Sequence, residues 1–349
     1  MSDAAMPMLD LRTAQRPAAV FTAAALGLML ASALLAGFVP LGFAIVTVFL
    51  FAGPHNWLEF RYFVGRMAPR WGRWKAFYLT GLGGVLTLTG AFIVMGVMSR
   101  NNIWGPDTLT YASALWNTGL VLWIAALVVL RNRRKAEADR AAGVAVAPAD
   151  WRLPMAVGLI LVSGVWMWPE VWSIAIVYIH PFVAFWFLDR EIARNRPAWL
   201  PAYRRALLAI PVVLAVLWWK LEGAPPLPGA DMLSMIIAQD AGSTVFSGVS
   251  SHALVSMHAF LEMLHYSVWV FAIPLVAMRT APWDFSKVPL ARVSRRWRLA
   301  VLGFATVSAG IVVLLWGAFL ANYPLTRDVY FTVAIGHVLA EATFLIKLL

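Results

Sequence analysis

The sequence contains no cysteine among its 349 residues, so disulfide bonds, thiolate metal ligands and iron–sulfur clusters are excluded. Charged residues are scarce, at 13%, and acidic residues number only 17. Hydrophobic residues make up 61% of the chain. A soluble domain cannot hide so much apolar surface, so the composition indicates a multi-pass membrane protein.

The common nucleotide-binding signatures are missing as well. The sequence has no P-loop, and the GLGG at 81–84 lies in an apolar run, where small residues favour close helix packing. Serine and aspartate are too scattered to indicate a catalytic triad. The net charge of +11 comes from basic residues in short loops between apolar runs. That arrangement is typical of membrane topology and argues against binding of nucleic acid.

Ten apolar segments approach the length of about 20 residues that a membrane-spanning helix needs. They cover residues 17–36, 40–63, 75–98, 109–130, 153–168, 170–189, 204–220, 251–278, 299–320 and 328–348. The fifth segment is the shortest. The expected fold class is therefore an all-α, polytopic membrane helix bundle of about ten transmembrane helices, with a single domain over residues 1–349.

Basic residues alternate from loop to loop along the chain. The loops after the second, fourth, sixth and eighth segments are rich in arginine and lysine, and the loops between them carry few. The positive-inside rule then places both termini in the cytoplasm, and we expect a bacterial inner-membrane protein. Residues 131–151 are expected to form a solvated cytoplasmic linker. In the longest outer loop, 221–250, the apolar stretch MLSMIIA predicts either a short helix or a flexible surface loop.

All six histidines lie on the second, sixth, eighth and tenth apolar segments. They are His55, His180, His252, His258, His265 and His337. Ionisable groups at membrane depth are costly unless they are paired, so these residues are functional candidates. His252 lies at the outer boundary of its segment, and we do not expect it to be a metal ligand.

Three of the histidines have a glutamate four residues later, which places both side chains on one face of a helix. The pairs are His55 with Glu59, His258 with Glu262, and His337 with Glu341. His265 follows His258 by two helical turns and extends the polar stripe of the eighth segment. Three such pairs stand out in a chain that has so few acidic residues.

Imidazole and carboxylate groups together suit a first-row transition metal. The predicted metal ligands are His55, His180, His258, His265 and His337. The predicted catalytic or ligand-supporting carboxylates are Glu59, Glu262 and Glu341, since a glutamate can bind the metal or accept the second ring N–H of a histidine. Pro54 and Pro181 adjoin two of the histidines and predict kinks there. The alternative for any one histidine is a hydrogen bond between helices.

Three short motifs resemble those of a known family, in the same order. GPHNWLE, YIHPFVAFWF and IGHVLAE are similar to blocks of the bacterial Brp/Blh-type β-carotene 15,15′-dioxygenases. The resemblance implies a membrane enzyme that cleaves a carotenoid with a histidine-ligated non-haem iron, bound here by His55, His180 and His337. Asn56 stands where the family has glycine, Glu59 stands where it has aspartate, and a further histidine block of the family is missing.

Four functions remain in competition at this stage. The first is an integral-membrane non-haem iron oxygenase acting on a lipophilic substrate such as a carotenoid or lipid, since histidine-ligated iron with an open position reacts with dioxygen. The second is a proton-coupled transporter that uses buried His/Glu pairs. The third is a haem-binding membrane subunit, and the fourth is a structural accessory subunit. The expected partners are the lipid bilayer and a lipophilic small molecule, whereas the oligomeric state is left open.

Overall fold

The computed structural model describes residues 11–66, 71–145, 150–229, 231–277 and 288–348. These residues form helices and turns, with no strand among them. Nine helical stretches in the described residues are long and apolar enough to cross a membrane, and Arg152–Met167 is a shorter apolar helix. The prediction of an all-α chain with many apolar helices is therefore confirmed, with nine such helices in place of about ten.

The helices follow the predicted segments in order. They are α1 (Leu11–Phe38), α2 (Pro40–Arg66), α3 (Lys75–Arg100), α4 (Pro106–Ala141), α5 (Arg152–Met167), α6 (Pro169–Asn195), α7 (Leu200–Leu207), α8 (Ala209–Leu221), α9 (Met232–Asp240), α10 (Ser251–Ser267), α11 (Ile273–Val276), α12 (Arg295–Ala321) and α13 (Tyr323–Leu348). Single turns of 3-10 helix precede α3, α7 and α12, and a π-helical turn, Val268–Ala272, joins α10 to α11.

The largest difference from the predicted boundaries is in α4, which continues through Ala141. The first half of the predicted linker 131–151 is therefore helix, and residues 146–149 lie outside the described residues. A hydropathy pattern ends where charged residues begin. Arginine, lysine, glutamate and alanine are nevertheless strong helix formers, so the helix itself continues.

Prolines decide where two of the other segments change. The seventh segment breaks at Leu208, because the ring of Pro211 conflicts with the carbonyl of Leu207 four residues earlier in a continuous helix. The π-helical turn ends at Ala272, two residues before Pro274, because a proline also disrupts the hydrogen bonds of the helical turn that precedes it. In contrast, α2 and α6 each run as one helix through Pro54 and Pro181, the two prolines beside the candidate histidines.

The chain divides into two compact units. The first comprises Met1–Phe51 and Ala184–Pro282, and the second comprises Ala52–Val183 and Trp283–Leu349. Two of the three boundaries pass through a helix, α2 at 51/52 and α6 at 183/184, and the third, at 282/283, lies outside the described residues. The single domain expected from the sequence stays a prediction.

In the first unit, α10 is the buried central helix and packs against α1. Ser256 donates a hydrogen bond to the carbonyl of Ala36 at 2.7 Å, and Nε2 of His252 lies 3.0 Å from the carbonyl oxygen of Gly37. The loop between α8 and α10 contains a short helix, α9, whose Ile237 is buried in an apolar cluster. The helical alternative for MLSMIIA is therefore the one observed.

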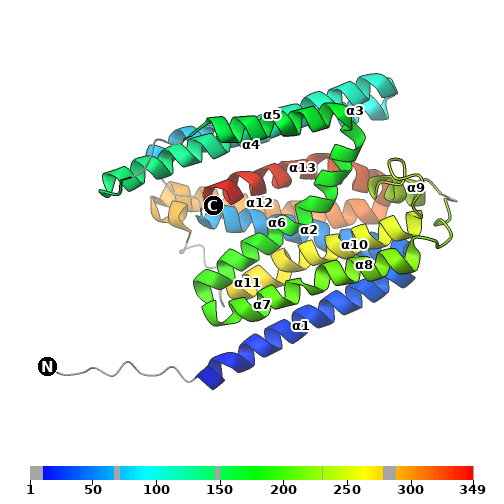
Figure 1. The fold of residues 1–349 in the computed structure, drawn as a ribbon, viewed down its shortest axis with the longest axis horizontal. Helices are drawn as coiled ribbons and strands as arrows, with labels where there is room; N and C mark the ends of the chain where they lie inside the picture. Colours follow the sequence, from blue (N-terminus) through cyan, green and yellow to red (C-terminus); the bar gives the residue numbers. More distant parts are fainter. Residues whose placement is uncertain (1–10, 67–70, 146–149, 230, 278–287, 349) are drawn as a thin grey trace. The chain divides into compact units, whose positions relative to one another are not determined.

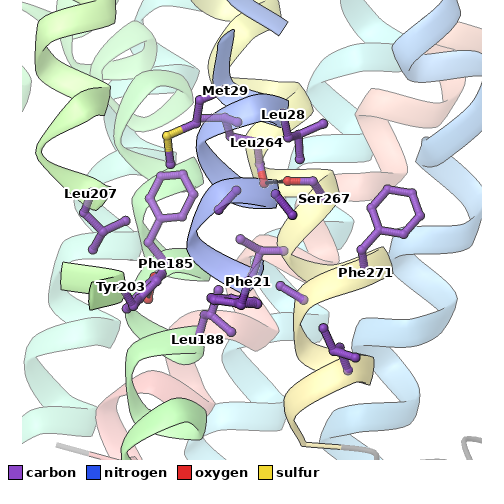
Figure 2. A pocket seen from close by; sticks show the side chains of 15 residues that line it. Phe21, Leu28, Met29, Phe185, Leu188, Tyr203, Leu207, Leu264, Ser267 and Phe271 are labelled. Atoms are coloured by element: carbon purple, nitrogen blue, oxygen red, sulfur yellow. Dashed lines mark hydrogen bonds between the residues drawn. The ribbon is translucent and has the colours of Figure 1, made fainter. Parts of the chain in front are cut away.

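The first unit also contains an apolar cavity of about 280 Å³ between α1, the end of α6, α7 and α10. Figure 2 shows Phe21, Met29 and Phe185 around it. Its two hydroxyl groups are already bonded: Tyr203 donates to the carbonyl of Phe185 at 2.7 Å, and Ser267 donates to the carbonyl of Leu264 at 2.7 Å. The hydroxyl groups of this cavity are thus satisfied within the protein.

In the second unit, α3 packs against both α4 and α13, and α5 runs beside α4 (Figure 1). Glycine allows the closest of these contacts. A Cβ added to Gly81 would lie 2.6 Å from Cγ2 of Thr343 on α13, and one added to Gly84 would lie 2.0 Å from Nε1 of Trp123 on α4. The GLGG stretch is therefore a helix-packing motif, as the sequence indicated.

Candidate metal centre

The candidate site lies in the second unit and begins with two residues of α2. His55 and Glu59 are one turn apart, so they share a face of the helix, and each side chain is only 1% exposed. The polar groups that follow the apolar run of α2 are therefore buried among other helices. Arg61, two residues further along, is partly exposed.

Helix α13 contributes a second pair with the same spacing, His337 and Glu341. Glu341 is 1% exposed and His337 is partly buried. Gly336 directly precedes this histidine, and a Cβ there would lie 3.2 Å from Oγ1 of Thr89 on α3. The missing side chain at position 336 therefore allows α13 to approach α3 closely beside the site.

Helix α6 supplies the third histidine. Nδ1 of His180 lies 3.1 Å from Oε2 of Glu341, a close polar contact between α6 and α13. A carboxylate at this distance from a ring nitrogen can favour one orientation of the imidazole.

The three imidazoles of this unit meet around His337. Its ring centroid lies 5.1 Å from that of His55 and 5.4 Å from that of His180. One ligand atom from each of His55, Glu59 and His337 lies within 4.8 Å of the others. Metal bonds to nitrogen and oxygen are about 2.0–2.2 Å long, so two ligands of one ion lie at most about 4.4 Å apart. Small side-chain adjustments would let these three residues bind a common cation.

The carboxylate of Glu59 is the strongest sign that something binds here. Both of its oxygens are buried, and neither accepts a hydrogen bond within the described part of the chain. A buried ionised carboxylate without such partners costs several kcal/mol. A cation bound between this carboxylate and the two imidazoles would remove that cost.

The remaining predicted site residues, His258, Glu262 and His265, belong to the first unit. Glu262 is 7% exposed and accepts a hydrogen bond from the hydroxyl of Tyr266 at 2.9 Å. His265 is 2% exposed, whereas His258 is partly buried. Their roles as ligands or catalytic groups stay predictions.

Beside the metal-site candidates, the second unit contains a cavity of about 1160 Å³. It is lined by α2, α3, α12 and α13, from Leu325 near one end of α13 to Phe344 near the other. Glu59 and His337 border it, and most other lining residues are apolar. The volume exceeds the range of about 300–1,000 Å³ that is usual for drug-sized ligands, so a long lipophilic molecule fits the shape.

Several polar residues of this cavity were not singled out from the sequence, Tyr330 and Thr89 among them. Tyr330 lies two helical turns before His337 on α13, so the spacing of seven was an available signal. Thr89 on α3 has no comparable signal in the sequence. Asn56, the residue after His55, borders the same cavity.

Comparison of the chain with protein-family models, curated proteins and solved structures finds no match. The resemblance to the Brp/Blh-type dioxygenases therefore rests on the three short motifs alone. The argument for a metal site in this chain therefore depends on the geometry described above.

Proposed function

We propose that this protein is a membrane-embedded metalloenzyme, a non-haem iron oxygenase, that acts on a lipophilic substrate. The observation that carries the proposal is the convergence of His55, Glu59 and His337 beside a large apolar cavity, with the oxygens of Glu59 accepting no hydrogen bond from the described residues. His180 and Glu341 extend the same cluster. The proposal includes a bacterial inner membrane with both termini in the cytoplasm.

Each residue has a distinct task in this proposal. His55, His337 and Glu59 hold the metal, and Glu341 orients His180 toward the cluster. A bound first-row metal with an open position would supply redox or Lewis-acid chemistry. The apolar walls of α2, α3, α12 and α13 hold the substrate and exclude water from the metal. Iron is favoured over other metals only by the motif resemblance.

Metal analysis of the protein purified in detergent tests the proposal directly. We expect about one or more equivalents of a first-row metal per chain, lost in both His337→Ala and Glu59→Gln. His252→Gln is the matched control, because His252 contacts the carbonyl of Gly37 in the first unit and glutamine can replace that hydrogen bond. A wild-type protein that stays metal-free after incubation with iron, zinc and manganese would refute the metalloenzyme.

A proton-coupled carrier is the second candidate, and the buried contact between His180 and Glu341 favours it, since such pairs relay protons in transporters. Proteoliposomes separate the two functions. Proton uptake that depends on a solute, disappears in Glu341→Gln and occurs in protein without metal would support the carrier.

A haem subunit is less consistent with the ring contacts of His337, which leave no gap for a porphyrin. A Soret absorption band in the purified protein would instead support the haem subunit.

A further inference from the structure

The cavity of the second unit is bordered by two residues with polar atoms that no described residue satisfies. Asn56 and Thr89 line the cavity, and Oδ1 of Asn56 and Oγ1 of Thr89 are buried and have no hydrogen-bond partner among the described residues. The two residues come from different helices, α2 and α3. The cavity of the first unit differs in this respect, because both of its hydroxyl groups donate to backbone carbonyls. An unmet polar atom in an apolar cavity usually marks the position of a ligand group or an ordered water.

The hydrogen bonds of Tyr330 determine which atom of the Asn56 amide is left over. The tyrosine hydroxyl has one proton, and it donates that proton to the carbonyl of Ala52 at 3.2 Å. The same hydroxyl must therefore accept the hydrogen bond from Asn56, which comes from Nδ2 at 3.0 Å. The amide cannot be turned round without losing this bond, so Oδ1 is the atom that is left unpaired.

An amide oxygen accepts hydrogen bonds and cannot donate them. Its partner must therefore carry a proton on oxygen or nitrogen, which excludes hydrocarbons, ethers, esters and ketones as the matching group. The hydroxyl of Thr89 can both donate and accept, so it does not distinguish among these classes. Asn56 is therefore the residue that distinguishes ligand groups that can donate a hydrogen bond from those that cannot.

The walls of the cavity indicate the rest of the ligand. Leu86 of α3, Ile311 of α12 and Val333 of α13 line it and are themselves exposed on the outside of the unit. The lining extends over twenty residues of α13, from Leu325 to Phe344, and the nineteen steps between them span about 28 Å at 1.5 Å per residue. An elongated apolar molecule fits such a cavity and could enter from the surrounding hydrocarbon.

We propose that the cavity binds a long-chain lipophilic alcohol, whose hydroxyl group donates a hydrogen bond to Oδ1 of Asn56. The inference rests on the proposed function only in identifying this occupant as the substrate of the neighbouring metal-site candidates. The binding step itself needs no metal, since neither the amide of Asn56 nor the apolar walls of the cavity are among those candidates, although Glu59 and His337 border the same cavity.

The test compares two probes, hexadecanol and hexadecyl methyl ether, in which a methyl group replaces the hydroxyl hydrogen, on the full-length protein in nanodiscs after treatment with a chelator. We expect the wild-type protein to bind the alcohol about 2- to 10-fold more tightly than the ether, the ratio expected for one neutral hydrogen bond. In Asn56→Leu the ratio should fall to about one. Ser308→Ala is the matched control, because Ser308 also lines the cavity but its hydroxyl already donates to the carbonyl of Phe304.

Equal binding of the two probes to the wild-type protein would overturn the inference, and that measurement needs no variant to fold. An alcohol preference that persists in Asn56→Leu would overturn it too, because another group would then be responsible. The metal content of untreated protein is measured separately. An alcohol preference in a protein that binds no metal would preserve this inference and refute the metalloenzyme, whereas the converse result would refute only this inference.

Discussion

Nδ1 of His180 on α6 lies 3.1 Å from Oε2 of Glu341 on α13, and the carboxylate is 1% exposed. Two helices that are far apart in the sequence are thus connected at a buried polar contact. A group that orients a metal-binding imidazole typically changes metal affinity when it is removed.

We therefore expect Glu341→Gln to weaken metal binding by about 10- to 100-fold, the range known for residues that support metal ligands. A titration against a competing chelator measures this change. Glu137→Gln is the control, since Glu137 pairs with Arg134 in an exposed contact within α4. An unchanged affinity in Glu341→Gln would show that this carboxylate neither binds nor supports a metal.

The packing of α3 on α4 gives a prediction about stability. In Gly84→Ala, the new Cβ would lie 2.0 Å from Nε1 of Trp123, which donates a hydrogen bond to the carbonyl of Thr80 at 2.9 Å. The helices must separate or the indole must move, so we expect a loss of about 1–3 kcal/mol in the free energy of unfolding.

Gly83→Ala is the matched substitution, because a Cβ at position 83 meets nothing within 4 Å. Alanine is also the better helix former by about 1 kcal/mol, so this variant should be as stable as the wild-type protein or more stable. Titration with a denaturing detergent compares the two. Equal stability of both variants would contradict the close contact between α3 and α4.

The start of α9 is expected to depend on pH. Asp231 accepts a hydrogen bond from the backbone N–H of Ser234 at 2.7 Å and another from its hydroxyl at 3.1 Å, and these bonds lower the pKa of the Asp231 carboxyl. Because the folded-state pKa is lowered, the stabilisation of the helix is complete above the unfolded-state pKa of about 3.9. It is lost as the pH falls through the lower folded-state pKa.

Hydrogen exchange of the peptide that covers α9 measures this effect, after correction for the intrinsic exchange rate at each pH. Protection should decrease in the wild-type protein as the pH falls below about 4. Asp231→Asn should keep the cap and lose the pH dependence, whereas Asp231→Ala should lower protection at every pH. Protection that is the same in all three proteins would show that the cap does not stabilise α9.

The proposed topology can be tested with little background, because the chain has no native cysteine. Ala138 lies on the exposed end of α4, and Gly229 lies in the longest outer loop. We expect Ala138→Cys to react with a membrane-impermeant maleimide only after the cells are permeabilised, and Gly229→Cys to react in intact cells. The opposite pattern would reverse the orientation proposed from the basic loops.

The sequence predicted the helices well because their apolar runs exceed the length of soluble helices, and it placed His55 with Glu59 and His337 with Glu341 by spacing alone. It could not rank those pairs above His258 with Glu262, because spacing within one helix says nothing about which helices are neighbours. The end of α4 was missed because hydropathy reports where lipid contact stops, and helix formation continues through Arg133 and Glu137. Thr89 gave no signal, since its importance comes only from the cavity it borders.

Helix α12 is the least buried of the apolar helices, with 6% of its most hydrophobic window buried, and it forms one wall of the large cavity. It meets α2 through a few side chains, with Trp57 bonded to the carbonyl of Ala305 and Phe60 against Phe304. Because so little of α12 is buried, this wall can shift to accommodate ligands of different width at little cost. The cavity should therefore select only weakly by the width of the ligand, and we expect it to accept branched or cyclic chains as well as linear ones.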